Sequence, residues 1–167
     1  MRIDVINIGD IIFLEDEMYD NKIVFKENSL PLDDFIRLKL QAFGGTCPKN
    51  TALASLKGSI YVLHAEIEGE IIAMSRVVGD GGFVHYIADV IVVPEHQGKG
   101  LGREIMNRTL HYIRHKMENG DRTTVCLFAA KSKEGFYEKF GFNSRPDENL
   151  GAGMQLWLKD DNSEDTK

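Results

Sequence analysis

Hydrophobic side chains recur along this chain with two periods, one typical of amphipathic helices and one typical of β-strands. Apolar residues three and four positions apart predict helices, with prolines, polar caps and glycines near the expected ends. Runs rich in β-branched residues, separated by turns such as Glu68-Gly69-Glu70, predict strands. The expected helices cover residues 31–43, 50–58, 101–120 and 132–140, and the expected strands cover residues 60–67, 71–78, 83–93, 123–129 and 154–158.

The two ends of the chain follow these periods less closely. Residues 3–8, 11–14 and 22–25 are rich in β-branched side chains and are candidates for additional edge strands. Residues 160–167 contain no apolar side chain, which predicts a disordered acidic tail. The 167 residues, 43% hydrophobic and 28% charged, fit one globular domain, which we expect over residues 1–159.

Charge and cysteine content narrow the functional classes. The formal net charge of -6 provides no basic surface for nucleic acid, and no apolar run is long enough to span a membrane. Cys47 and Cys126 do not form a CxxC pair, and the first residues lack the apolar core of a secretory signal. We therefore expect a cytoplasmic protein in which both cysteines are small buried side chains rather than nucleophiles.

A glycine-rich loop over residues 93–103 carries most of the functional information. It joins an apolar strand to an amphipathic helix, and Gly98, Gly100 and Gly102 allow positive φ and a close approach of backbone amides to a ligand. The start of the following helix adds unpaired amides and a partial positive charge. This arrangement predicts an anion site, and a diphosphate is a suitable occupant.

Two common phosphate-binding motifs do not match this loop. A P-loop requires Gly-Lys-Ser or Gly-Lys-Thr at its end, which is absent here. A dinucleotide fingerprint requires G-x-G-x-x-G, but the loop has glycine at position 102, one place too early, and Arg103 at the final position. Nucleotide hydrolysis and dinucleotide binding are thus the less favoured interpretations.

The loop resembles motif A of the GCN5-related N-acetyltransferases, whose pattern is [QR]-x-x-G-x-[GA] between a strand and a helix. Gln97, Gly100 and Gly102 occupy its fixed positions. Downstream, residues 136–142, Phe-Tyr-Glu-Lys-Phe-Gly-Phe, are similar to the end of the motif B helix. Two motifs in the expected order are far more specific than one, and the resemblance covers about residues 57–159.

The resemblance implies an α/β (α+β) fold and a coenzyme site. The fold has a central mixed, mostly antiparallel twisted sheet of about seven strands, helices on both faces, and a splayed strand pair that holds acetyl-CoA. The pantetheine arm would replace a neighbouring strand along part of this pair, and the loop would hold the pyrophosphate. Many relatives have an Asn that contacts the coenzyme arm at the position where this chain has Ala130. The implied coenzyme-binding residues are Ile91, Val92, Val93, Gln97, Gly98, Lys99, Gly100, Leu101, Gly102, Arg103, Ala130, Phe136, Tyr137 and Lys139.

Tyr137 is the candidate general acid. It matches the motif B tyrosine that protonates the departing thiolate in many relatives, and an ordinary phenol is protonated at neutral pH. The alternative is that Tyr137 packs in the core with Phe136 and Phe140.

Asp89 is the candidate base that accepts a proton from the amine. Period-two alternation places it on one strand face with His85, Ile87, Ile91 and Val93, as an ionisable group among apolar ones. A structural role, in which the carboxylate accepts backbone hydrogen bonds, is equally open, and His85 is a weaker candidate.

Together these features predict direct transfer of an acetyl group from acetyl-CoA to a primary amine of a small molecule or peptide. No metal is expected, because the histidines share no ligand spacing with a carboxylate or cysteine. Arg76, Arg145 and Glu66 are candidates for the acceptor site, and both a monomer and a homodimer are compatible with the sequence. The main alternative is a non-catalytic acyl-CoA-binding or regulatory module.

Overall fold

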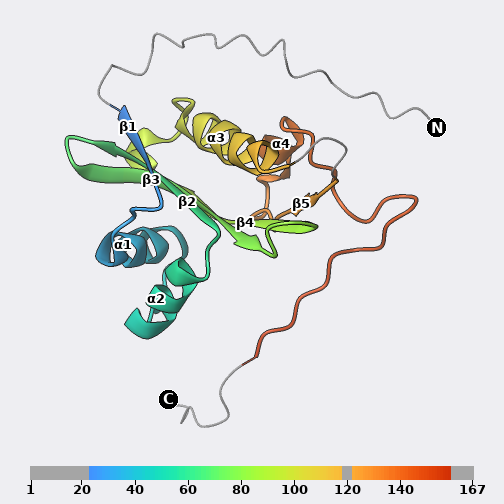
Figure 1. The fold of residues 1–167 in the computed structure, drawn as a ribbon, viewed down its shortest axis with the longest axis horizontal. Helices are drawn as coiled ribbons and strands as arrows, with labels where there is room; N and C mark the ends of the chain where they lie inside the picture. The colour runs from blue at the N-terminus through green and yellow to red at the C-terminus, as the bar shows by residue number, and fades with distance from the viewer. Residues whose placement is uncertain (1–22, 118–121, 159–167) are drawn as a thin grey trace. The chain divides into compact units, whose positions relative to one another are not determined.

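The computed structural model describes residues 23–117 and 122–158, whose course is shown in Figure 1. The chain divides after Leu127 into two compact units. The first contains the sheet and helices α1, α2 and α3, and the second contains helix α4. The expected strands at residues 3–8 and 11–14 and the expected tail at residues 160–167 lie outside the described residues.

The first unit is built on a mixed five-stranded sheet in the order β1-β2-β3-β4-β5. The first four strands pair antiparallel as predicted, and β5 pairs parallel with β4. The predicted α/β class is confirmed, while the described residues contribute five strands to the sheet rather than about seven. The strands are β1 (Ile23–Glu27), β2 (Tyr61–Ile67), β3 (Glu70–Gly79), β4 (Val84–Val92) and β5 (Thr124–Cys126).

Helices cover both faces of this sheet (Figure 1). Ser75 and Arg76 are neighbours in β3, so their side chains point to opposite faces. The Ser75 hydroxyl lies 2.6 Å from the hydroxyl of Thr109 in α3 (Leu101–His115), whereas the Arg76 guanidinium donates to the carbonyl of Ser55 in α2 (Lys49–Lys57). Helix α1 (Leu32–Phe43) lies on the Arg76 face, since the Phe35 ring is 5.5 Å from the guanidinium carbon of Arg76.

The core consists of β2 and β3 between the two helical layers. Because both faces of these strands are covered, their side chains are buried almost continuously rather than alternately. Phe35 and Leu38 of α1 pack on one side, and Ile105 and Met106 of α3 are fully buried as well. The 3.6-residue period of both helices arises from this one-sided burial.

A β-bulge interrupts β4 and overturns one prediction. Met74 pairs with Ile91, but Arg76 pairs with Ala88, so two residues of β4, Asp89 and Val90, lie opposite Ser75. Directly paired residues share a face. Because of the extra residue, the side chains of β4 after the bulge point to the opposite face from the one that simple alternation predicts. Residues 85, 87, 89, 91 and 93 therefore do not share one face, and that prediction is wrong.

The residues of that predicted face are divided between the two sides of the sheet. Ile87 pairs with Val77 on the α3 side, and His85 shares its face by period two. Ile91 pairs with Met74 on the α1 side, where the Asp89 carboxylate also lies, 2.7 Å from the Lys39 ammonium. Asp89 has a φ of 51°, a left-handed conformation that is unusual outside glycine.

The second unit contains a helix shorter than predicted. Helix α4 covers Glu134–Glu138 rather than residues 132–140, and its first turn follows Ser132, which has a φ of 67°. The aromatic rings of Phe136, Tyr137, Phe140 and Phe142 form a cluster, with centroid separations of 5.0 to 6.2 Å.

The predicted strand at residues 154–158 is absent from the described structure. Met154, Leu156, Trp157 and Leu158 are 80 to 92% exposed. An alternating pattern becomes a strand only when a ladder partner and a face to cover are present, and neither is supplied to this segment by the described residues.

Candidate functional site

The glycine loop connects the end of β4 to the start of α3. After Val93 the chain forms a short 3-10 helix, η2 (Pro94–His96), which sequence patterns did not predict. The Gln97 side-chain amide then donates to the carbonyl of Val92 at 2.8 Å, so that Gln97 holds the loop against the strand it leaves. Gly98 and Gly100 have φ values of 73° and 85°, as the glycine pattern predicted. Gly102 differs, because it lies within the first turn of α3.

The start of α3 has the properties of an anion site. Gly100 is its N-cap and provides no side-chain cap. The first bond of the helical series runs from the Glu104 amide to the Gly100 carbonyl at 3.1 Å, so the amides of residues 101–103 precede that series. Lys99 and Arg103 add exposed cations to the loop and the first turn. Backbone amides, a helix N-terminus and two cations fit the pyrophosphate of a coenzyme.

Strand β4 leads into this loop with one edge paired to β3. Its hydrogen-bonded register with β3 reaches Val92, and the amide of Val93 donates to the carbonyl of Ile72 at 2.9 Å. On the other edge, the register with β5 covers Val84 to Tyr86. The side chains of Ile91 and Val93 are buried, and Val92 is half-buried.

Asp89 is held between two cations at the bulge. Its Oδ2 accepts a hydrogen bond from Arg76 Nε at 2.6 Å, and its Oδ1 accepts one from Lys39 Nζ at 2.7 Å. The Asp89 and Arg76 side chains are 8% and 10% exposed, against 31% for Lys39. Arg76 Nη1 also donates to the Ser55 carbonyl and the Ser59 hydroxyl. This buried ion cluster joins α1, α2, β3 and β4.

Lys39 is the residue of this cluster that sequence analysis missed. In the sequence it is one lysine on an amphipathic helix, 50 positions from Asp89. Its Nζ lies 5.1 Å from the centroid of the Phe43 ring and 5.9 Å from that of Phe35. Arg76 was a candidate for the acceptor site and lies beside Asp89, whereas the second such candidate, Glu66, forms an ion pair with Lys26 on β1.

The remaining candidates belong to the second unit. Tyr137 and Phe136 lie in α4, Lys139 follows the helix, and the carbonyl of Ala130 accepts a hydrogen bond from the Lys133 amide in the preceding turn. Arg145, the third acceptor-site candidate, also belongs to this unit.

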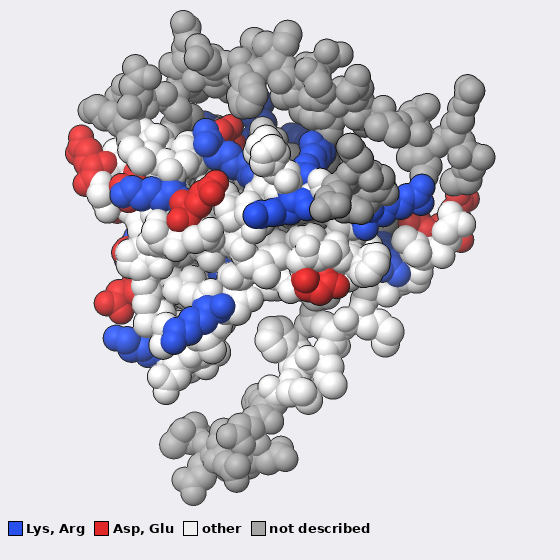
Figure 2. Space-filling model, in the orientation of Figure 1, with Lys and Arg blue, Asp and Glu red and all other residues white. Residues whose placement is uncertain are grey.

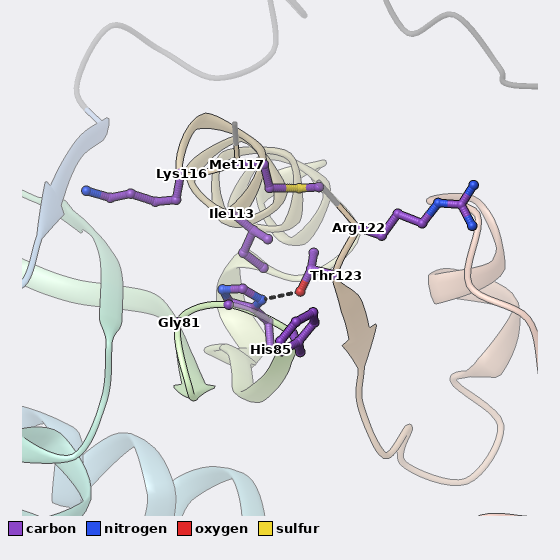
Figure 3. A pocket seen from close by; sticks show the side chains of 9 residues that line it. Gly81, His85, Ile113, Lys116, Met117, Arg122 and Thr123 are labelled. Carbon is purple, nitrogen blue, oxygen red and sulfur yellow. Dashed lines mark hydrogen bonds between the residues drawn. The ribbon is translucent and has the colours of Figure 1, made fainter. Parts of the chain in front are cut away.

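A cavity of about 500 Å³ lies at the far end of α3 from the glycine loop (Figure 3). The helix has 15 residues, which corresponds to about 22 Å. The buried His85 ring is in this cavity, with Nδ1 2.7 Å from the Thr123 hydroxyl. His85 therefore lies on the opposite face of the sheet from Asp89. Its hydrogen-bond partner is Thr123, whereas Asp89 bonds to Lys39 and Arg76. The cavity is lined by Gly81, Gly82, Phe83, His85, Ile113, Lys116, Met117, Arg122 and Thr123.

Other predictions concern the surface and the cysteines. Cys126 is exposed and Cys47 partly exposed, so the expectation that both are buried is wrong. Figure 2 shows basic and acidic side chains interspersed on the face in view. In the part of the chain that the structure describes, no three His, Cys, Asp or Glu side chains gather as metal ligands would. No helix among the described residues has the length and apolar character needed to cross a bilayer.

Comparison with known proteins identifies the architecture. The family model "Acetyltransferase (GNAT) domain" matches residues 57–144, more than half of the chain. A crystal structure of a probable acetyltransferase from methicillin-resistant Staphylococcus aureus superposes with a TM-score of 0.71 at 26% identity, covering 81% of this chain and 99% of that one.

Curated relatives match over a smaller share of the chain than this crystal structure does. An uncharacterized N-acetyltransferase of Pyropia yezoensis is 30% identical over 114 residues, which cover 66% of this chain and 62% of the relative. The chloroplastic serotonin N-acetyltransferase 2 of Oryza sativa subsp. japonica is 38% identical over 79 residues, which cover 47% of this chain and 38% of the relative. The matched region thus spans about half the length of these relatives.

Proposed function

The chain belongs to the acetyltransferase (GNAT) superfamily, and on this premise we propose that it transfers an acetyl group from acetyl-CoA to a primary amine. Membership of this family implies acetyl-CoA as the donor. The observation that carries the proposal is the loop before α3, where Gly98 and Gly100 adopt positive φ and the amides of residues 101–103 stand at a helix N-terminus suited to an anion. A small molecule or a peptide is proposed as the acceptor.

The proposed coenzyme site draws residues from β4 and from the glycine loop that follows it. Ile91, Val92 and Val93 would pair with the pantetheine arm, a proposal supported by the register with β5, which covers only the first part of β4. The backbone of residues 97–103, with Lys99 and Arg103, would hold the pyrophosphate. Ala130, Phe136, Tyr137 and Lys139 complete the proposed contacts. The bound coenzyme supplies an activated acetyl thioester.

Two residues are proposed to move protons. Asp89 would accept a proton from the acceptor ammonium, and the support for this role is that its carboxylate already binds a primary ammonium, that of Lys39. Tyr137 would donate a proton to the departing thiolate, as its match to motif B suggests. The amine attacks directly, so that the protein needs no nucleophile of its own.

The proposed organisation is one acetyltransferase domain over residues 1–159 with an acidic tail at 160–167. The family match supports it, because residues 57–144 extend across both compact units. The cytoplasm remains our proposed compartment, although several relatives are named as chloroplastic. The rice relative is named for serotonin, so arylalkylamines belong in the first acceptor panel together with polyamines and lysine peptides. The absence of a metal is likewise proposed, and both a monomer and a homodimer stay open.

The first experiment measures CoA release with a thiol reagent across that acceptor panel. Release that depends on an amine supports the transferase. Tyr137→Phe should lower turnover by about 100-fold or more while acetyl-CoA binding persists. Tyr112→Phe is the matched control, because its hydroxyl donates to the Ile60 carbonyl within the fold. Tight acetyl-CoA binding with no release would favour the non-catalytic module, and undiminished turnover in Tyr137→Phe would exclude the general-acid role.

A further inference from the structure

Lys39 occupies the position that an amine acceptor would need beside Asp89. Its Nζ is a primary ammonium 2.7 Å from the carboxylate oxygen, and two phenylalanine rings lie within 6 Å of it. A carboxylate with aromatic side chains around it is a suitable environment for an alkylammonium group. At 31% exposure, the Lys39 side chain is also accessible from solvent.

The other cation at Asp89 differs in its chemistry. Arg76 is 10% exposed and makes further hydrogen bonds to Ser55 and Ser59. A guanidinium remains protonated under all ordinary conditions, so it cannot act as a nucleophile. Lys39 carries an amine that becomes nucleophilic once it loses a proton. Of the two cations on Asp89, only Lys39 can therefore be acylated.

We propose that Lys39 is a self-acetylation site: the protein transfers an acetyl group from acetyl-CoA to Nζ of its own Lys39. The inference rests on the proposed function and extends it to an internal substrate. Asp89, the proposed base, is two residues before Ile91, where the proposed pantetheine site begins. The proton acceptor and the start of the donor site thus lie two residues apart at the end of β4. The amine comes from α1, which packs on that strand.

The reaction balances without a further reagent. Asp89 takes one proton from the Lys39 ammonium, and the neutral amine attacks the thioester carbonyl. The new N–C bond forms and the C–S bond breaks, the second proton lost by the nitrogen passes to the departing thiolate, and Asp89 releases its proton to water. The product is a neutral acetamide, so Asp89 loses one of its two cations and its Oδ1 becomes available to the ammonium of an external acceptor.

The test uses the full-length protein, isotopically labelled acetyl-CoA and no added acceptor, with the label located by peptide mass spectrometry. Lys49 is the internal control, since its side chain is 72% exposed and lies 3.8 Å from the carboxylate of Asp33, which is itself 88% exposed. Chemical acetylation favours the exposed lysine. We expect label on Lys39 at about 100 times the rate on Lys49, at the low end of what a general base contributes. The rate per molecule should not change on dilution, because the transfer is intramolecular.

Two variants distinguish the outcomes. Lys39→Arg should abolish labelling at this position, and Asp89→Asn should reduce it to the Lys49 rate, with folding checked by thermal melting. If Asp89→Asn does not fold, the ratio of the labelling rates of Lys39 and Lys49 and the dilution series, both measured on the unmodified protein, still test the inference. Unlabelled Lys39 in a protein that acetylates external amines would overturn this inference alone. Labelling of Lys39 at the Lys49 rate would also overturn it, whereas no transfer to any amine would remove the proposed function itself.

Discussion

Removal of one partner from the ion cluster at the bulge should be strongly destabilising, and Arg76→Met tests this. The substitution removes a hydrogen bond of 2.6 Å to a carboxylate that is 8% exposed, in a pair whose other side chain is 10% exposed. Removing one partner of a buried ion pair costs about 3 to 5 kcal/mol. Lys39 still neutralises part of the Asp89 charge, so we expect a loss at the lower end, about 3 kcal/mol in the free energy of unfolding.

The assay is urea denaturation of the unmodified protein, Arg76→Met, Asp89→Asn and the double variant. Because the two residues are in contact, the cycle should give a coupling free energy of about 2 kcal/mol. The pair Lys49 and Asp33 is the matched control, since both side chains are mostly exposed and 3.8 Å apart. Its coupling should be below about 0.5 kcal/mol. Equal coupling in the two cycles would refute the assignment of Asp89 to a buried ion cluster.

Two further predictions concern pH and the glycine loop. Burial lowers the pKa of His64 from its ordinary 6.5, so the unfolded chain binds a proton first and stability should fall as pH drops below 6.5, levelling off once the folded form is also protonated. Urea midpoints from about pH 8 to about pH 5 should show this slope, and His64→Leu should flatten it. Gly100 has a φ of 85°, so Gly100→Ala should destabilise the fold by about 1 to 2 kcal/mol. Gly102 is helical, so Gly102→Ala should be neutral or stabilising by up to about 1 kcal/mol. Thermal unfolding of the two variants tests this prediction. An equal loss of stability in both would refute the assignment of the effect to backbone conformation.

Elements with local signals were predicted well from sequence. Helix α1 and the hairpin of β2 and β3 agree with the expected ranges within one or two residues, because their amphipathic or β-branched patterns reflect burial in the core. The positive φ values of Gly98 and Gly100 could also be anticipated, since glycine is the residue that adopts them at low cost. The hydrophobic period of residues 154–158 was misleading, because a strand also depends on a partner that the pattern does not specify.

The error at β4 has a different physical origin. Alternation assigns faces correctly only while each residue has one partner across the ladder. Asp89 and Val90 share Ser75, a fact that depends on how β3 and β4 align and not on either sequence segment alone. The clearest departure from local rules thus falls at Asp89, a polar residue in left-handed conformation. Such departures are expected where a strand is shaped for function, and Asp89 at this bulge is the proposed base.

The two halves of the proposed site therefore differ in how far sequence determines them. The proposed coenzyme loop is local, since Gln97, Gly98, Gly100 and the start of α3 lie within a few residues, and the Gln97 side chain bonds to the carbonyl of nearby Val92. The surroundings of Asp89 are tertiary, because Lys39 comes from a helix 50 positions away and Arg76 from the neighbouring strand. Substitutions in α1 can change the groups beside Asp89 without altering the loop. On the proposed function, this separation would allow one anion-binding motif to serve different acceptors, with α1 as the element that distinguishes them.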